Sequence, residues 1–134
     1  MLAAAAIIFV GCTPSPECDQ ACADSVNAAM VRQVEADRAA LQLDPFLVCV
    51  RHHESDRGAY PHIGGYQAQN PISSASGAYQ FLDSTWRNAS AAAGLAGWGR
   101  AKEAPWWVQD AIAHHLAIEL GQRGHWAGTG CAGT

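Results

Sequence analysis

The sequence predicts a small domain of the α+β class, mostly α, with a short hairpin or irregular loop between its helices. Apolar residues recur at helical spacing in two stretches, one around Val26, Met30 and Val34 and the other in residues 104–120 (APWWVQDAIAHHLAIEL). Residues 66–86, which lie between them, are rich in turn formers, amides and hydroxyls. The chain has 134 residues, which is enough for one domain with a modest core.

Composition and charge narrow the possible functions. Charged residues make up 15% of the chain and its formal net charge is -4, so the sequence has no basic footprint for nucleic acid. The chain contains five Trp, whose wide apolar faces serve either a core or a flat ligand. We expect at least two of Trp86, Trp106 and Trp107 in the core, and Trp98 and Trp126 freer to meet solvent or ligand.

The N-terminus predicts export. Leu2 to Val10 form an unbroken apolar run that is too short to cross a bilayer but fits the apolar region of a signal peptide. Gly11 and Cys12 follow it, as in a bacterial lipobox, so we expect a signal peptide over 1–11 and a lipid on Cys12. This places the protein in the bacterial cell envelope, as a membrane-anchored lipoprotein or a secreted protein. The alternative is a buried N-terminal helix.

A tether and a spacer are expected next. Residues 12–23 contain the TPSPE stretch and fit a lipid-anchored tether. Asp24 or Ser25 can cap a spacer helix over 24–43, whose apolar spacing continues to Leu41.

Cysteine usage also fits an oxidising compartment. Besides Cys12 there are Cys18, Cys22, Cys49 and Cys131, an even set that permits three pairings. We favour a disulfide between Cys49 and Cys131, which leaves Cys18 to Cys22. A zinc site is the alternative, but the paired spacing of zinc modules is missing.

The catalytic domain is expected over 44–134. Asp44 is a ready N-cap and Pro45 fits the first helical position, which predicts a helix ending near Glu54. A carboxyl group in the last turn faces the negative end of the helix dipole, and partial burial beside Leu47 would also disfavour its charged form. Both effects raise the pKa of Glu54, as a general acid requires. The alternative is an exposed glutamate at a helix end.

Histidines near Glu54 raise the question of a metal. His52 and His53 lack the second histidine at the spacing of a zincin helix. His114 and His115 are neighbours on a helix, so their side chains should diverge. We therefore expect no metal and no cofactor.

Residues 66–86 have the chemistry that holds sugars. Hydroxyls of a sugar bond to amide groups, and its C–H faces pack on aromatic rings. Asp83 or Ser84 can start a helix near the end of this stretch.

Several motif elements here occur in a specific order. Glu54-Ser55 is followed by Tyr66, by Asn70-Pro71, by Ser74 and Ala75, by Gly77-Ala78-Tyr79-Gln80-Phe81 and by Thr85-Trp86. This order resembles the lytic transglycosylase and goose-type lysozyme superfamily. The late Trp126 and Cys131 make the chain most similar to the resuscitation-promoting factor branch. The resemblance covers about residues 44 to 131.

The resemblance implies a fold, a substrate and a mechanism. The fold would be a small lysozyme-like domain with a glycan cleft, and the reaction would cleave the β-1,4 bond between N-acetylmuramic acid and N-acetylglucosamine in peptidoglycan. Glu54 would be the one essential acid, because Asp56 should point away and Asp83 is explained as a helix cap. The residues that match cleft-lining positions of the family, and that we expect to bind substrate, are Tyr66, Asn70, Tyr79, Gln80 and Thr85.

The chain departs from the branch at one position, and one rival function remains. The branch usually carries cysteine directly before the catalytic glutamate, whereas Cys49 stands about one helical turn before Glu54. The rival is a non-catalytic lipoprotein that binds cell-wall glycan. Expected partners are the peptidoglycan glycan strands, the membrane through a lipid anchor only, and another cell-wall hydrolase.

Overall fold

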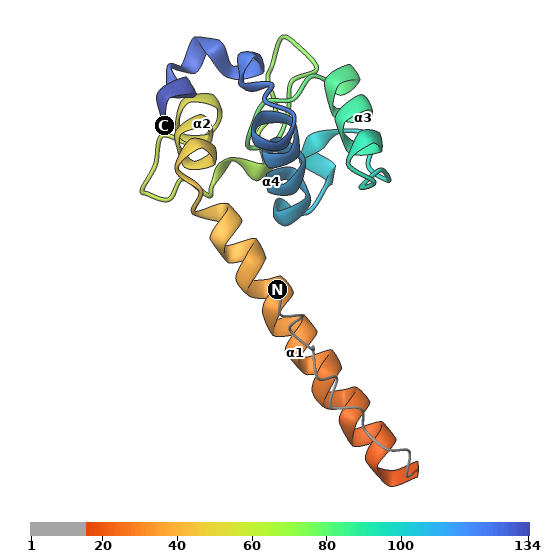
Figure 1. Ribbon diagram of the computed structural model, residues 1–134. Coiled ribbons are helices and arrows are strands. Elements are labelled where there is room, and N and C mark those ends of the chain that lie inside the picture. The colour runs from red at the N-terminus through yellow and green to blue at the C-terminus, as the bar shows by residue number, and fades with distance from the viewer. Residues whose placement is uncertain (1–15) are drawn as a thin grey trace, which may run out of the picture. The chain divides into compact units, whose positions relative to one another are not determined.

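A computed structural model describes residues 16–134, and helices dominate them (Figure 1). Over this range no strand forms, and the β pairing consists of isolated antiparallel bridges that join Ser76 to Gln69 and to Phe81. The predicted mostly helical class is confirmed. In chain order the elements are α1 (Pro16–Gln42), α2 (Pro45–Glu54), η1 (Gly65–Gln67), α3 (Asp83–Ala92), η2 (Ala101–Glu103), α4 (Trp106–His114), η3 (His115–Glu119), η4 (Arg123–Thr129) and η5 (Cys131–Gly133).

Helix α1 starts earlier than the sequence suggested. We expected a tether over 12–23 and a cap at Asp24 or Ser25, whereas α1 begins at Pro16 and continues to Gln42. The segment is rich in alanine, the residue with the highest helix propensity, so the helix extends past the expected caps. None of the helices within residues 16–134 has the length and apolarity needed to cross a membrane.

The chain divides into two compact units, Met1–Ala36 and Asp37–Thr134. In the first unit the predicted apolar spacing is present, but Val26, Met30 and Val34 are exposed. The second unit contains the end of α1 and all later elements.

Three predictions on the N-terminal segment fall outside the described residues and side chains. They are the signal peptide over 1–11, the lipid on Cys12 and the pairing of Cys18 with Cys22.

Helix α2 begins as predicted. The Asp44 carboxylate caps it by accepting a hydrogen bond from the backbone N–H of Leu47 at 3.1 Å, and Pro45 is the first helical residue. The N–H of Ser55 donates to the carbonyl of Arg51 at 3.0 Å and closes the last turn. Glu54 is therefore the last residue of the helix.

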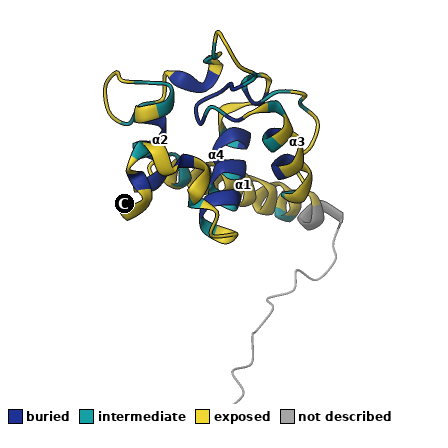
Figure 2. Cartoon of the chain, turned by 90° about the horizontal axis from the view of Figure 1, so that it is seen from above, coloured by how far each residue is buried: buried dark blue, intermediate teal, exposed yellow. Residues whose placement is uncertain are grey.

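Helices α2, α3 and α4 turn buried faces toward a common core (Figure 2). Apolar side chains at helical spacing fill this core. They include Phe46, Leu47 and Val50 of α2, Trp86 and Ala89 of α3, and Val108, Ile112 and Ala113 of α4.

Two of the expectations for the tryptophans need correction. Trp126 is 4% exposed, packs against the rings of Phe46 and Phe81, and donates its indole N–H to the carbonyl of Tyr79 at 3.0 Å. Local sequence gives no sign of this burial, because η4 folds back on α2. Among the other three, Trp86 is fully buried, whereas Trp107 is partly buried and Trp106 is exposed.

The predicted disulfide between Cys49 and Cys131 is confirmed. It joins the middle of α2 to η5, and η4 and η5 pack against α2 beside it. The C-terminal turns are thereby attached to the helix that carries Glu54.

Helix α3 begins at Asp83, but Asp83 is not its cap. Leu82 takes the N-cap position without a side-chain bond, while the Asp83 carboxylate pairs with the Arg100 guanidinium at 3.2 Å.

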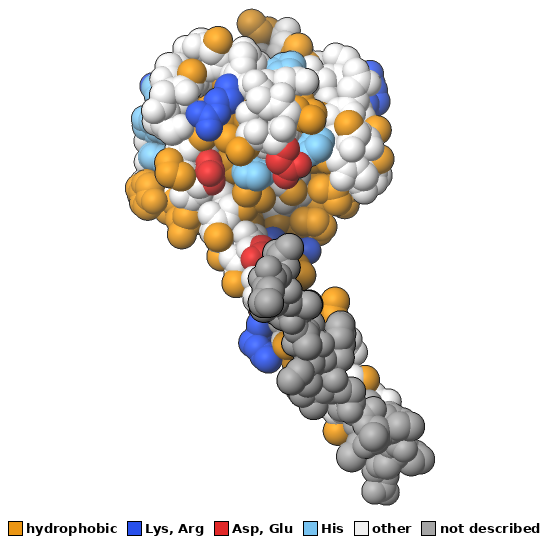
Figure 3. Space-filling model, viewed as in Figure 1, with side chains coloured by type: hydrophobic (Ala, Val, Ile, Leu, Met, Phe, Trp, Pro, Cys, Tyr) orange, Lys and Arg blue, Asp and Glu red, His pale blue; other side chains and the backbone are white. Residues whose placement is uncertain are grey.

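On the face of the second unit that Figure 3 shows, Lys and Arg side chains stand apart from one another rather than forming a basic patch.

Candidate active site

Glu54 ends α2 with a half-buried side chain. Its carboxyl group makes no hydrogen bond or ion pair with any residue of the described range, 16–134. Partial burial raises the pKa of Glu54, since a carboxylate loses water contacts there and gains no partner. The end of the helix adds the negative pole of its dipole, which acts in the same direction. These surroundings favour a carboxylic acid that keeps its proton.

Ser55 fastens the end of α2 to the loop that follows η1. Its hydroxyl donates to the carbonyl of Ala78 at 2.7 Å. Gly65 also packs against Ser55 so closely that a Cβ there would overlap the Ser55 hydroxyl. The glycine is therefore required by close approach, and Glu54 is held next to the segment that contains Ala78.

The loop over residues 68–81 is braced from beneath by Gln109. The Gln109 side chain is fully buried; its oxygen accepts from the N–H of Ala78 at 2.9 Å, and its amide donates to the carbonyls of Tyr66 and Ala104 at 3.1 and 3.0 Å. Gly77 has φ +76° and leaves no room for a Cβ beside Gln109. The Gly-Ala pair of the motif is thus explained by two contacts with Gln109. Gly77 is needed because a Cβ would not fit there, and Ala78 donates its backbone N–H to the Gln109 oxygen.

Four buried side chains form a polar cluster under the site: Arg51, Tyr66, Tyr79 and Asp110. Tyr66 and Tyr79 donate their hydroxyls to one oxygen of Asp110 at 2.8 and 2.5 Å. Arg51 donates to the Tyr79 hydroxyl at 2.8 Å and lies 3.7 Å from Asp110. Burial raises the pKa of Asp110 and of both tyrosines. We did not anticipate the burial of Arg51 or Asp110 from the sequence.

This cluster changes the roles expected for two aromatic residues. We expected Tyr66 and Tyr79 to bind substrate, but they are 8% and 1% exposed, and Asp110 holds both hydroxyls. Their rings brace the site from inside. Most of the Tyr79 surface is closed to a sugar ring.

The other three expected binding residues lie in or near the loop. Asn70 accepts a hydrogen bond from the N–H of Ile72 at 3.0 Å and so shapes a turn. Gln80 is partly exposed at φ +51°, and its amide donates to the carbonyl of Gly77 at 3.0 Å. Thr85, on α3, is partly exposed.

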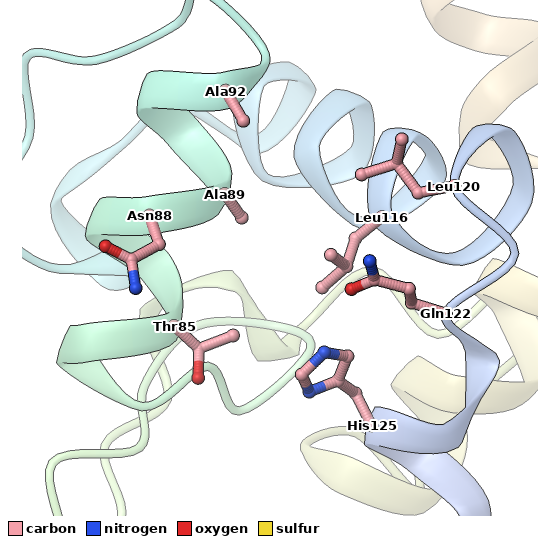
Figure 4. A pocket seen from close by; sticks show the side chains of 8 residues that line it. All are labelled: Thr85, Asn88, Ala89, Ala92, Leu116, Leu120, Gln122 and His125. Atoms are coloured by element: carbon pink, nitrogen blue, oxygen red, sulfur yellow. The ribbon is translucent and has the colours of Figure 1, made fainter.

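Two adjoining depressions lie beside this loop. The first, the small hollow, has a volume of about 90 Å³ and is lined by Tyr79, Gln80, Phe81, Leu82, Thr85, His125 and Trp126. The second, the large groove, has a volume of about 330 Å³ and is lined by Thr85, Asn88, Ala89, Ala92, Leu116, Leu120, Gln122 and His125 (Figure 4). Thr85 and His125 belong to both.

Some of the predicted site residues line these depressions and others do not. Gln80 and Thr85 meet in the small hollow, whereas Glu54 lines neither depression. Glu54 is linked to them through the bond from Ser55 to loop 68–81. Sequence reasoning missed His125, whose one signal was its place beside Trp126.

Asp56 is the carboxylate nearest to Glu54 in sequence, and its oxygens are occupied. They accept hydrogen bonds from the N–H groups of Gly58 at 2.8 Å and Gly64 at 2.7 Å. These backbone donors lower the pKa of Asp56. Asp56 therefore organises its own loop as a carboxylate.

Histidines and cysteines also gather near α2. Among residues 16–134, the group whose atoms lie close enough to share a metal ion is Cys49, His53 and Cys131. The disulfide joins both sulfurs to each other, so neither is a thiolate ligand here.

The arrangement offers one half-buried acid, a braced loop with a partly exposed amide, and two depressions beside it that no Asp, Glu, Lys or Arg lines. No protein-family model, no curated protein and no solved structure matches the chain.

Proposed function

We propose that the second unit cleaves peptidoglycan at the β-1,4 bond between N-acetylmuramic acid and N-acetylglucosamine, as a lytic transglycosylase or a muramidase. The observation that carries the proposal is the Glu54 carboxyl group, which is half-buried, has a raised pKa and has no polar partner in residues 16–134. A structural carboxylate would have a cation or backbone donors, as Asp56 does.

The mechanism uses Glu54 twice. Its proton goes to the glycosidic oxygen as the bond to the muramyl carbon breaks, which leaves Glu54 ionised. The N-acetyl group of the substrate helps stabilise the oxocarbenium-like centre, because no second carboxylate is assigned to this role. Glu54 then takes a proton from the muramyl C6 hydroxyl or from water as that oxygen attacks. In this reaction Glu54 is the single catalytic group.

Substrate would lie along loop 68–81. The Gln80 amide and the Thr85 hydroxyl offer polar groups in the small hollow, and the indole of Trp126 supplies an apolar floor. Asn70 would contact glycan only at the far edge of this loop. The same proposal includes export to the cell envelope and a lipid on Cys12. It also includes cooperation with another cell-wall hydrolase.

The test compares Glu54→Gln with wild type on purified peptidoglycan, with muropeptide release measured by mass spectrometry. Loss of the proton donor should lower the rate on the order of 10²-fold or more, while the melting temperature does not fall below that of wild type. Glu35→Gln, at an exposed position of α1, is the matched control and should keep the wild-type rate. Release of muropeptides by Glu54→Gln at the wild-type rate would reject the mechanism.

Asp56→Asn distinguishes one acid from two. It should stay within a few-fold of wild type, because the Asp56 oxygens are bound to backbone N–H groups. A loss as large as that of Glu54→Gln would indicate a two-carboxylate mechanism.

The rival function, glycan binding without turnover, is favoured by one observation: Glu54 lies outside both depressions. It predicts that wild type binds glycan but releases no product. The same product analysis therefore decides between the two functions.

A further inference from the structure

The large groove has an apolar floor between two walls (Figure 4). Ala89 and Ala92 of α3 face Leu116 and Leu120 across it. Leu116 is buried, whereas Leu120 is 48% exposed although it lines a concave surface. A ligand that covers these methyl and isobutyl groups removes apolar surface from water, which favours binding.

The polar side chains around this floor are uncommitted. In the part of the chain that the structure describes, no side-chain hydrogen bond is made by Asn88 or Gln122, which stand on opposite walls. No Asp, Glu, Lys or Arg lines the groove. Its lining thus combines apolar contacts with carboxamides that can both donate and accept.

From this lining, and on the basis of the function proposed above, we infer that the large groove binds the peptide stem carried by the muramyl residue. Such a stem is a short peptide that includes alanines and is joined by amide bonds. Its alanyl methyl groups suit the floor, and its backbone amides suit Asn88 and Gln122. Its carboxylates would remain in water at the mouth, because neither Lys nor Arg lines the groove.

Position and size support this occupant. The groove meets the small hollow at Thr85 and His125, so a stem attached to a sugar in the hollow can enter the groove directly. Its volume of about 330 Å³ can hold a few residues of a short peptide. A glycan strand without stems would leave the apolar floor uncovered.

The first experiment measures turnover of peptidoglycan with stems and of the same glycan after an amidase has removed them. Wild type should cleave the stem-bearing strand at least about tenfold faster, since methyl burial and amide bonds add to binding. Ala92→Phe fills the groove and should abolish this preference. Ala91→Phe, at the neighbouring exposed position that does not line the groove, should keep it. Equal rates on both strands in wild type would overturn the inference and leave the proposed function intact.

A binding experiment separates failure of the groove from failure of catalysis. Isothermal calorimetry on the full chain compares a GlcNAc–MurNAc disaccharide bearing a tetrapeptide with the same disaccharide without peptide. The peptide should tighten binding about tenfold in wild type and in Glu54→Gln, but not in Ala92→Phe. Equal affinity for both disaccharides in wild type would refute the inference. A stem effect on binding without turnover would refute only the proposed catalysis.

Discussion

Arg51 and Glu54 lie one turn apart on α2 and have opposite surroundings. Arg51 is fully buried and has a partner at each guanidinium nitrogen: it donates to the Tyr79 hydroxyl and to the carbonyls of His62, Gln42 and Pro61. Glu54 is half-buried, and its carboxyl group has no partner in residues 16–134.

The difference separates Arg51, whose charge stabilises the fold, from Glu54, to which we assign the proposed catalysis. A buried charge is tolerated when hydrogen bonds and an opposite charge replace water, and Arg51 has both. A carboxyl group without such partners costs free energy unless it is protonated, and the protonated form is the one that the proposed cleavage requires. One helix thus anchors the fold at Arg51 and presents an acid at its end.

The largest expected effect on stability comes from Arg51→Met. It should lower the free energy of unfolding by about 3–5 kcal/mol, because Asp110 then stays buried without its cation. Urea denaturation measures this loss. Arg87→Met, at an exposed position of α3, is the control and should change stability by less than about 0.5 kcal/mol. Equal stability of the two variants would mean that the polar cluster is not structural.

A smaller effect is expected from Tyr79→Phe. The variant removes the hydroxyl that donates to Asp110 and accepts from Arg51, and should cost about 1–3 kcal/mol. Tyr60→Phe, at a residue that is 70% exposed, should be neutral. If the two variants unfold at the same urea concentration, the Tyr79 hydroxyl contributes nothing to the cluster.

The smallest effect should come from Glu54→Gln, and its size depends on pH. The folded state raises the pKa of Glu54 above its ordinary value of 4.5, so folding favours the protonated form. This contribution is fully present below the unfolded pKa and is lost as pH rises through the folded pKa. The variant should match wild type at low pH and become more stable than it near neutral pH, on the order of 0.5 kcal/mol because water screens a half-exposed group. A variant less stable than wild type at pH 7 would mean that ionised Glu54 has a stabilising partner.

The sequence predicted the helix that carries Glu54 and the disulfide that joins this helix to the C-terminal turns. Asp44 and Pro45 set the start of α2 because capping depends on neighbours in sequence, and the position of Glu54 at its end followed. Pairing of Cys49 with Cys131 was also predicted correctly. The mostly helical class followed from apolar spacing.

Apart from the disulfide, the long-range partners of the polar side chains could not be predicted. Arginine is almost never fully buried unless it is paired, and the partner of Arg51, Asp110, lies on a different helix. Likewise the sequence predicted Asp83 as a helix cap, whereas in the structure its carboxylate pairs with Arg100 from a later loop. These contacts depend on how elements pack, which a single sequence does not encode locally.

One local feature was not predicted. The imidazoles of His114 and His115 contact different oxygens of the Glu119 carboxylate, at 3.4 and 2.6 Å. Residues His115–Glu119 form a π-helical turn, which widens the helix and brings a residue five positions away onto the same face. Side-chain directions for a regular α-helix do not apply there.

The attachment of the C-terminal turns to α2 has a consequence for biosynthesis. Gln80 and Thr85 emerge from the ribosome before His125 and Trp126, which complete the depressions beside them. The disulfide that fastens these turns needs Cys131, which is synthesised later still. A nascent chain therefore carries Glu54 long before the two depressions are complete, and the disulfide can fasten the C-terminal turns only after synthesis has passed Cys131.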